Sequence, residues 1–126
     1  MKVKEVMQQE FLPIEGERSI QTAEKIMEKS GIDIMPVVMG KNIMGMITDR
    51  DIDTKILARG LDPKNARVST GMTEKLFVCG QDDRIETAAR KMERCRTRHM
   101  VVMNRHRQLV GLVSIDGLRE NLDRQH

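Results

Sequence analysis

The residues best suited to chemistry lie in the stretch MGMITDRDI, residues 44–52, where an apolar run ends at Thr48 and gives way to three charges. If the run is a strand that passes into a helix here, the threonine hydroxyl and the free helix amides meet at one edge, and such amides attract phosphate. Asp51 follows three residues later, and its two carboxylate oxygens can accept hydrogen bonds from both vicinal hydroxyls of a ribose. The stretch therefore predicts a nucleotide site, with phosphate at Thr48 and ribose at Asp51.

The same spacing also has a purely structural interpretation. Threonine and aspartate are favoured helix N-caps, so Thr48 or Asp49 can start the helix and Asp51 can complement its dipole. Asp49 and Asp51 also form an Asp-x-Asp pair, which in other settings holds a divalent ion. The chain lacks the large nucleotide-sugar domain that this chemistry uses, so no metal site is expected. No Ser-His-Asp, Cys-His or paired general-acid arrangement predicts catalytic residues.

A second stretch, LVGLVSIDGL at residues 109–118, repeats the pattern with one difference. Ser114 supplies the hydroxyl, but Gly117 stands where the first stretch has Asp51, and Asp116 would lie about 100° away around a helix. The strand, the hydroxyl and the helix thus persist without an aspartate, which indicates that the junction itself does not require one. We expect a competent site at Asp51 and a degenerate second site. The second site is assigned to Ser114, Val113 and Asp116.

Composition limits the classes of protein to consider. A chain of 126 residues suits one compact unit or two small subdomains with a shared core. Only 2% of the residues are aromatic, so the core must draw on aliphatic residues and on 11 Met, which fill irregular gaps. No apolar run reaches the length of a membrane span and the basic start lacks the apolar segment of a signal peptide, so we expect a cytoplasmic protein without a membrane partner. Cys79 and Cys95 lack CxxC spacing and are expected to be reduced thiols.

The two halves of the chain repeat one another. A series of positions recurs at a constant shift of 65 residues, and after one extra residue in the second half the shift becomes 66. The first-half members of the 65-residue series are Val3, Met7, Ile20, Thr22, Ala23, Met27, Met35 and Val37. This regularity predicts two copies of one supersecondary unit, residues 1–60 and 68–126, joined by a linker over 61–67 that contains Pro63.

Each copy is expected to fold in the order β-α-β-β-α. Apolar residues at 3.6-residue spacing predict the first helix of each copy, and Asp83 with Glu86 resembles a capping box at the second of these helices. Gly60 is expected to end the last helix of the first copy. The expected helices span 19–30, about 50–59, 84–95 and 116–124, and the expected strands span 12–14, 34–39, 42–48, 76–78, 99–104 and 108–114. Because one copy cannot bury both faces of its sheet, the copies are expected to pack as an α/β disc with pseudo-twofold symmetry.

The tandem Val-x-x-x-Met, the run IMPVV and the paired GMITDRDI and GLVSIDGL resemble a CBS-domain pair, named for cystathionine β-synthase and also called a Bateman module. The resemblance covers nearly the whole chain, and TDRDI followed by ARGLDP is similar to small stand-alone bacterial and archaeal CBS proteins. Such proteins are usually regulatory modules that bind AMP, ADP, ATP, NAD or S-adenosylmethionine in clefts between the repeats, and they commonly form flat homodimers. The resemblance implies an adenosine-nucleotide ligand, no catalytic cofactor and no enzyme activity.

The resemblance also implies which residues line the Asp51 cleft. In the family, one repeat supplies the Thr/Ser-x-x-Asp motif and the other supplies backbone against which the base packs. Arg98 and His99 would place cations near the phosphates of a ligand, although they also suit the solvated end of a basic helix. The residues assigned in this way are Asp51, Thr48, Ile47, Arg50, Asp33, Ile34, Val78, Cys79, Thr97, Arg98 and His99.

Three functions are compatible with these features. The leading hypothesis is a ligand-sensing regulatory module that signals to a separate, unknown effector protein through a conformational or dimer change. The second is a ligand-free dimeric scaffold for protein interactions. The third is nucleic-acid binding through the basic region 90–107. It is disfavoured because the net charge is only +3, acidic residues dilute the basic cluster and no stacking aromatic accompanies it.

Overall fold

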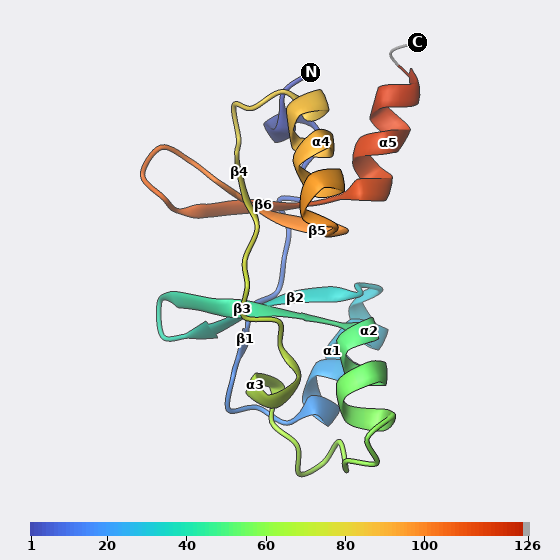
Figure 1. Ribbon diagram of the computed structural model, residues 1–126. Helices are drawn as coiled ribbons and strands as arrows, with labels where there is room; N and C mark the ends of the chain where they lie inside the picture. Colours follow the sequence, from blue (N-terminus) through green and yellow to red (C-terminus); the bar gives the residue numbers. More distant parts are fainter. Residues whose placement is uncertain (125–126) are drawn as a thin grey trace. The chain divides into compact units, whose positions relative to one another are not determined.

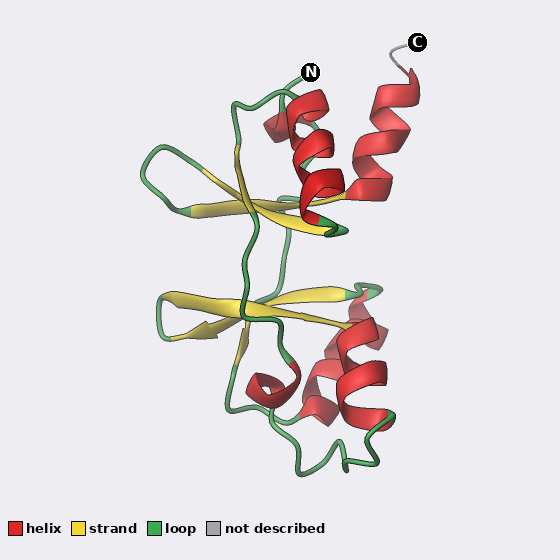
Figure 2. Ribbon diagram, in the orientation of Figure 1, coloured by secondary structure: helices red, strands yellow, loops and turns green. Residues whose placement is uncertain are grey.

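Two β-hairpins, one from each half of the chain, organise the structure, a computed structural model that describes residues 1–124. Each hairpin gains a third strand, and helices cover one face of each resulting three-stranded sheet (Figures 1 and 2). The first unit contains Leu12–Lys75, and the second contains Met1–Phe11 together with the chain from Leu76 onward. The mixed α/β class expected from the sequence is confirmed.

The first unit follows the expected element order closely. Its sheet has the order β1-β2-β3, with β1 parallel and β3 antiparallel to β2, and Ile34 is paired with Thr48 at one end of the hairpin. Gly60, expected to end a helix, lies in the turn after the helical segment that stops at Leu57 with Ala58 as its C-cap; its φ is 72° and its N–H donates to the Leu57 carbonyl. The elements are β1 (Ile14–Glu15), α1 (Ile20–Ser30), β2 (Ile34–Met39), β3 (Asn42–Thr48), α2 (Asp49–Asp51), the π-helix η2 (Ile52–Leu57) and α3 (Val68–Gly71).

The second unit repeats this plan. Its sheet has the order β4-β5-β6, with β4 parallel and β6 antiparallel to β5. His99 is paired with Ser114, in the place that Ile34 and Thr48 take in the first unit. The elements are the 3₁₀-helix η1 (Val3–Glu5), β4 (Val78–Gly80), α4 (Ile85–Cys95), β5 (His99–Met103), β6 (Leu109–Ser114) and α5 (Ile115–Arg124).

Each unit has its own hydrophobic core, built from one face of its first long helix and the inward residues of its hairpin. Met35 in the first unit and Met100 in the second are fully buried, as expected of gap-filling methionines, whereas Met39 and Met44 are exposed. Among residues 1–124, no helix has both the length and the apolar character needed to cross a membrane.

The segments that begin the two repeats are exchanged between the units. Val3 is buried in the core of the second unit and Val68 in the core of the first. Matching backbone bonds hold both segments: the Val3 N–H donates to the Asp83 carbonyl and the Val68 N–H to the Arg18 carbonyl, each at 2.8 Å. The compact units therefore differ from the sequence division 1–60 and 68–126, because each Val-x-x-x-Met segment packs with the other repeat. The expected linker 61–67 lies within the first unit.

The two long helices begin differently. At α1, the Ser19 hydroxyl accepts a hydrogen bond from the Thr22 N–H at 3.1 Å, an N-cap of the usual kind. The capping box expected at Asp83 and Glu86 is wrong, because the N-cap of α4 is Arg84. The Asp83 carboxylate turns back instead and accepts the Gly80 N–H at 2.8 Å.

Candidate ligand-binding site

The end of β3 and the start of α2 are joined by a reciprocal capping box. The Thr48 hydroxyl accepts a hydrogen bond from the Asp51 N–H at 3.0 Å, and the Asp51 carboxylate accepts one from the Thr48 N–H at 3.0 Å. Thr48 has an extended backbone and the next residues are helical, so the chain changes conformation at this residue. Asp51 therefore also has a structural role in this copy, since its carboxylate satisfies a backbone amide at the junction.

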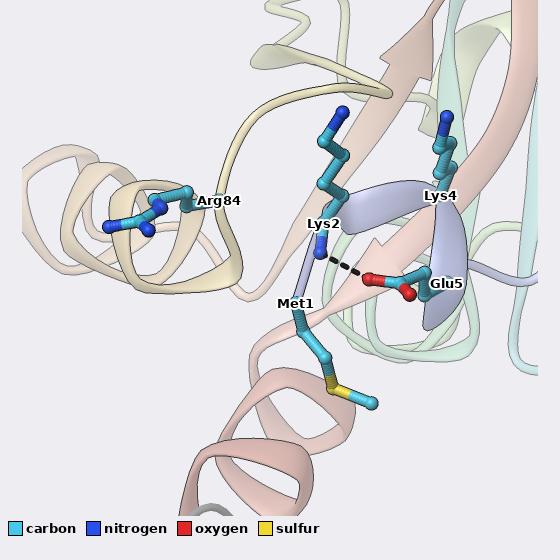
Figure 3. A pocket seen from close by; sticks show the side chains of 5 residues that line it. All are labelled: Met1, Lys2, Lys4, Glu5 and Arg84. Carbon is cyan, nitrogen blue, oxygen red and sulfur yellow. Dashed lines mark hydrogen bonds between the residues drawn. The ribbon is translucent and has the colours of Figure 1, made fainter.

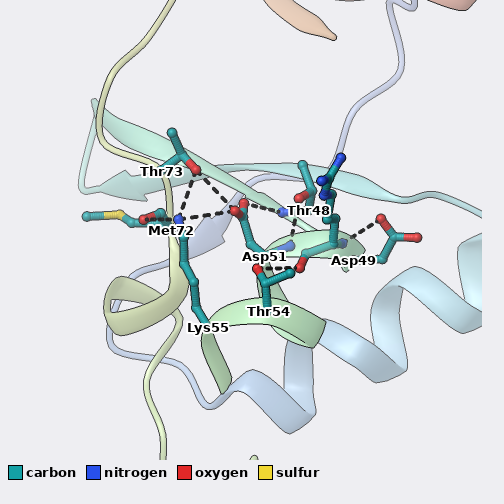
Figure 4. A network of polar contacts seen from close by, with 8 residues as sticks. Thr48, Asp49, Asp51, Thr54, Lys55, Met72 and Thr73 are labelled. Carbon is teal, nitrogen blue, oxygen red and sulfur yellow. Dashed lines mark hydrogen bonds and ion pairs between the residues drawn. The ribbon is translucent and has the colours of Figure 1, made fainter. Parts of the chain in front are cut away.

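The second oxygen of the Asp51 carboxylate is also engaged (Figure 4). Oδ1 accepts a hydrogen bond from the Thr73 hydroxyl at 3.1 Å and pairs with Lys55 Nζ at 3.1 Å. Lys55 Nζ also lies 3.1 Å from Thr73 Oγ1 and 3.4 Å from the Met72 carbonyl oxygen. The Asp51 side chain is only 13% exposed and that of Lys55 33% exposed, so this ion pair is better shielded from solvent than a surface pair.

Other predicted site residues of the first unit surround the same junction. The Asp33 carbonyl accepts a hydrogen bond from the Asp49 N–H at 3.0 Å, which ties the start of β2 to the start of α2. The side chains of Ile34 and Ile47 are buried, and Ile47 belongs to the core of the first unit. Arg50 is exposed beside the capping box. The structure thus brings Asp33, Ile34, Ile47, Thr48, Arg50 and Asp51 together.

The second junction, at the end of β6, keeps half of this arrangement. The Ser114 hydroxyl accepts a hydrogen bond from the Gly117 N–H at 3.0 Å, but a glycine has no side chain to return the bond. A Cβ added at Gly117 would stand 3.1 Å from Ser114 Oγ, so a larger residue there would press on the serine cap. Val113 is buried, and Asp116 is exposed and pairs with Arg98 at 3.0 Å.

The remaining predicted residues belong to the second unit, and three of them lie at its own junction. The Arg98 carbonyl accepts the Ile115 N–H at 2.8 Å, and the Thr97 hydroxyl donates to the His99 carbonyl at 3.0 Å. Val78 and Cys79 lie in β4, next to β5. The structure therefore places Thr97, Arg98 and His99 beside Ser114, in the position that Asp33 and Ile34 have beside Thr48.

Sequence reasoning missed two residues of the first junction, Lys55 and Thr73. Lys55 follows Asp51 by four residues, the spacing at which opposite charges meet on a helix, so its role had a local signal. Thr73 lies 22 residues beyond Asp51, and no local sequence pattern around Thr73 predicts its contact with Asp51.

Cys79 is a titratable group whose environment is clearly altered. Burial in β4 raises the pKa of its thiol to about 11, and the nearby Asp83 carboxylate acts in the same direction while Lys91 opposes it. The thiol is therefore protonated at neutral pH. Cys95, at the end of α4, is partly exposed.

We predict that a thiol reagent at pH 8 modifies Cys95 and spares Cys79, because only an accessible thiolate is a good nucleophile. Titration with a chromogenic disulfide should give one fast equivalent in the native protein and a second only in denaturant. A Cys95→Ser variant should give no fast equivalent. Modification of Cys79 in native Cys95→Ser protein at a comparable rate would contradict the protected position of this thiol.

A separate cavity lies in the second unit, away from all the predicted residues (Figure 3). It has a volume of about 430 Å³ and is lined by Met1, Lys2, Lys4, Glu5 and Arg84. The Lys2 backbone N–H donates to the Glu5 carboxylate at 2.6 Å, and the side chains of Lys2 and Lys4 pair at 3.8 and 3.3 Å with Asp82, which lies outside the lining. Among residues 1–124, no three His, Cys, Asp or Glu side chains converge in a way that could hold a metal ion.

Two units of matching topology, each with a hairpin that runs through a hydroxyl cap into a helix, define a tandem-repeat α/β protein. The family model described as CBS domain matches residues 3–58 and 66–124. The chain therefore belongs to the CBS-domain family, as the sequence motifs indicated.

Known proteins agree with this assignment. The CBS domain-containing protein YhcV of Bacillus subtilis (strain 168) is 29% identical over 119 residues, which are 94% of this chain and 84% of that protein. A protein with CBS domains from Burkholderia ambifaria MC40-6 has a similar structure, with a TM-score of 0.88 and 26% identity over 97% of this chain and 93% of that one. The CBS domain pair of protein MJ0100, solved with 5-methylthioadenosine and S-adenosyl-L-methionine, has a TM-score of 0.86 and 23% identity, covering 100% and 98% of the two chains.

Other curated relatives are much longer than the matched region. The chain covers 24% of two archaeal relatives that are named as enzymes, a homoserine O-acetyltransferase and an L-aspartate semialdehyde sulfurtransferase. The match to these proteins therefore concerns about a quarter of their length.

Proposed function

We propose that the protein is a regulatory module that binds an adenosine-containing nucleotide at Asp51 and transmits its occupancy to a partner protein. The observation that carries this proposal is the difference between two otherwise matching junctions. Both have a hydroxyl cap at the end of the hairpin, but only the first adds a carboxylate, Asp51, where the second has Gly117. The first junction thus has an acceptor for ribose hydroxyls beside a helix start that suits phosphate.

The ligand class follows from this chemistry. A vicinal diol would bind the Asp51 carboxylate, and a phosphate would meet the Thr48 hydroxyl and the exposed Arg50 guanidinium. AMP, ADP, ATP, NAD and S-adenosylmethionine all carry an adenosine with this diol. The MJ0100 pair, which shares the fold, was solved with two adenosine compounds, and this supports the class. We place the module in the cytoplasm as a homodimer without enzyme activity.

Titration with the five candidate ligands tests the proposal. A ligand present at a hundred times its Kd should raise the free energy of unfolding by about 2.7 kcal/mol, which thermal shift and calorimetry both detect. Asp51→Asn keeps the size of the side chain but removes its charge, and should weaken binding at least tenfold. Asp53→Asn, the same change at an exposed position of η2, is the matched control and should bind like the wild type.

The outcomes separate the candidate functions. Binding that survives Asp51→Asn unchanged would move the site elsewhere on the chain. If none of the five ligands binds, the sensor function is refuted and the scaffold function gains support. The scaffold has its own structural basis, since Met39 and Met44 of the β2–β3 hairpin are 62% and 39% exposed, and exposed apolar side chains of this size favour protein contacts.

A further inference from the structure

We propose that Lys55 and Thr73 form a clamp on Asp51 that a bound ligand has to open, so that ligand binding releases the chain segment around Thr73 from the edge of β3. This inference rests on the proposed function, because it takes Asp51 as the ribose acceptor. It adds two residues that set the affinity of the site and names the segment through which occupancy is passed on.

The segment around Thr73 is held by backbone hydrogen bonds to β3 and by the packing of Met72 against the first core. A pair of backbone hydrogen bonds joins it to Met46: the Met46 N–H donates to the Thr73 carbonyl at 3.0 Å, and the Thr73 N–H donates to the Met46 carbonyl at 2.8 Å. The polar cluster of Asp51, Lys55 and Thr73 adds side-chain contacts at the same place (Figure 4). Two residues further along the chain, at Lys75, the first unit ends.

The Asp51 carboxylate has little remaining capacity for a ligand. Two carboxylate oxygens offer about four acceptor positions. The Thr48 N–H, the Thr73 hydroxyl and Lys55 Nζ already occupy three of them. A ribose diol brings two donors, so at least one present donor has to leave.

Thr73 is the donor that a ligand displaces most easily. The Thr48 N–H belongs to the capping box, and its loss would leave a helix-start amide without its partner. Lys55 carries a full charge that a carboxylate holds strongly, whereas the Thr73 hydroxyl is neutral. When Thr73 leaves, Lys55 also loses its contact with Thr73 Oγ1. The backbone pair with Met46, the contact of Lys55 with the Met72 carbonyl and the packing of Met72 against the first core then hold the segment.

The second unit provides an internal comparison, because it has the backbone pair without the clamp. Gln8, which matches Thr73, exchanges two backbone hydrogen bonds with Leu112 at 2.8 and 3.0 Å. The residues matching Asp51 and Lys55 are Gly117 and Asn121, and the Asn121 amide donates to the Gly117 carbonyl at 2.9 Å. The backbone pair is thus part of the repeated fold, and the charged cluster is an addition in the first unit.

The clamp is first tested without ligand, by residue-resolved hydrogen exchange. In Thr73→Val and in Lys55→Met, the amides at positions 46 and 73 should exchange about tenfold faster than in the wild type, since contacts with a charged partner are lost. The amides of Gln8 and Leu112 should not change. Thr54→Val is the matched control, because its hydroxyl donates to the Arg50 carbonyl at 2.9 Å and takes no part in the clamp. Unchanged exchange at positions 46 and 73 in both variants would overturn the inference.

The second test adds AMP, ATP and S-adenosylmethionine in turn and measures Kd by calorimetry. Thr73→Val should bind about three- to tenfold more tightly than the wild type and than Thr54→Val, because the competing hydroxyl is gone. Ligand at saturation should speed exchange at positions 46 and 73 of the wild type. If ligands bind but Thr73→Val has unchanged or weaker affinity, the inference fails and the proposed function stands. If no compound binds either protein, the proposed function fails, and the ligand-free exchange rates alone decide whether the clamp holds the segment.

Discussion

Replacing Val3 by aspartate is expected to lower the free energy of unfolding by about 4 kcal/mol or more, because a charge would enter a fully buried position. The location of the damage is the more informative part of this prediction. Val3 begins the first repeat in sequence but lies in the core of the second unit. Hydrogen exchange measured by peptide should therefore accelerate first in residues 76–124.

Val68→Asp is the mirror experiment, since Val68 is equally buried but lies in the core of the first unit. This variant should accelerate exchange first in residues 12–75. Gln9→Asp places the same charge at an exposed position of the first segment and should change stability by less than about 0.5 kcal/mol. Accelerated exchange in residues 12–60 of Val3→Asp, with residues 76–124 unaffected, would contradict the exchange of segments between the units.

Gly45→Ala is the second substitution with a large expected effect, a loss of about 3 kcal/mol. A Cβ at this position would stand 2.5 Å from the Thr73 carbonyl oxygen, closer than two such atoms can approach, and 3.2 Å from the Met72 sulfur. The obstacle is backbone that is itself hydrogen-bonded to Met46, so it cannot move without breaking that pairing. Urea unfolding monitored by circular dichroism measures the loss.

Two other glycines serve as graded controls. A Cβ at Gly111 would stand 2.6 Å from the sulfur and 2.9 Å from Cγ of the flexible Met7 side chain, and 3.1 Å from the Gln8 carbonyl oxygen. Because the closest obstacle is a side chain that can move, Gly111→Ala should cost less than Gly45→Ala. At Gly16 the nearest atoms are 3.5 Å away, an ordinary contact, and Gly16→Ala should be nearly neutral. If Gly111→Ala lowers the free energy of unfolding more than Gly45→Ala does, the prediction is wrong, and β3 must shift to make room for the alanine at position 45.

The regular elements of this fold were predictable because their signals are local. The strands expected at 34–39 and 42–48 coincide with β2 and β3, and the helix expected at 19–30 differs from α1 by one residue. The start of α4 was not predictable in the same way. There the Ile85 N–H donates to the carbonyl of Met1, a partner supplied by the far end of the chain, so no local capping pattern was needed. The sequence likewise did not predict that Val3 and Val68 are exchanged between the units, because each packs with residues that are distant in the chain.

In the candidate site, too, the local features were predictable and the contacts between distant residues were not. Thr48 and Asp51 are three residues apart, and their spacing predicts both a helix cap and a ribose acceptor, of which the cap is now seen directly. The repeat comparison singled out Asp51 correctly as the difference between the junctions but did not find its structural role. That role depends on contacts with Lys55 and Thr73, and Thr73 reaches Asp51 through the path of the chain between the two repeats.

The exchanged segments also determine the order in which the two units can fold during synthesis. The first unit is continuous in sequence, so all its parts have been synthesised once Lys75 has been added. Residues 1–11 are translated before the first unit, yet their backbone partners extend to Leu112. Throughout that interval Val3 has no core to enter, and a chaperone or a second nascent chain can meet this apolar segment before its own unit exists.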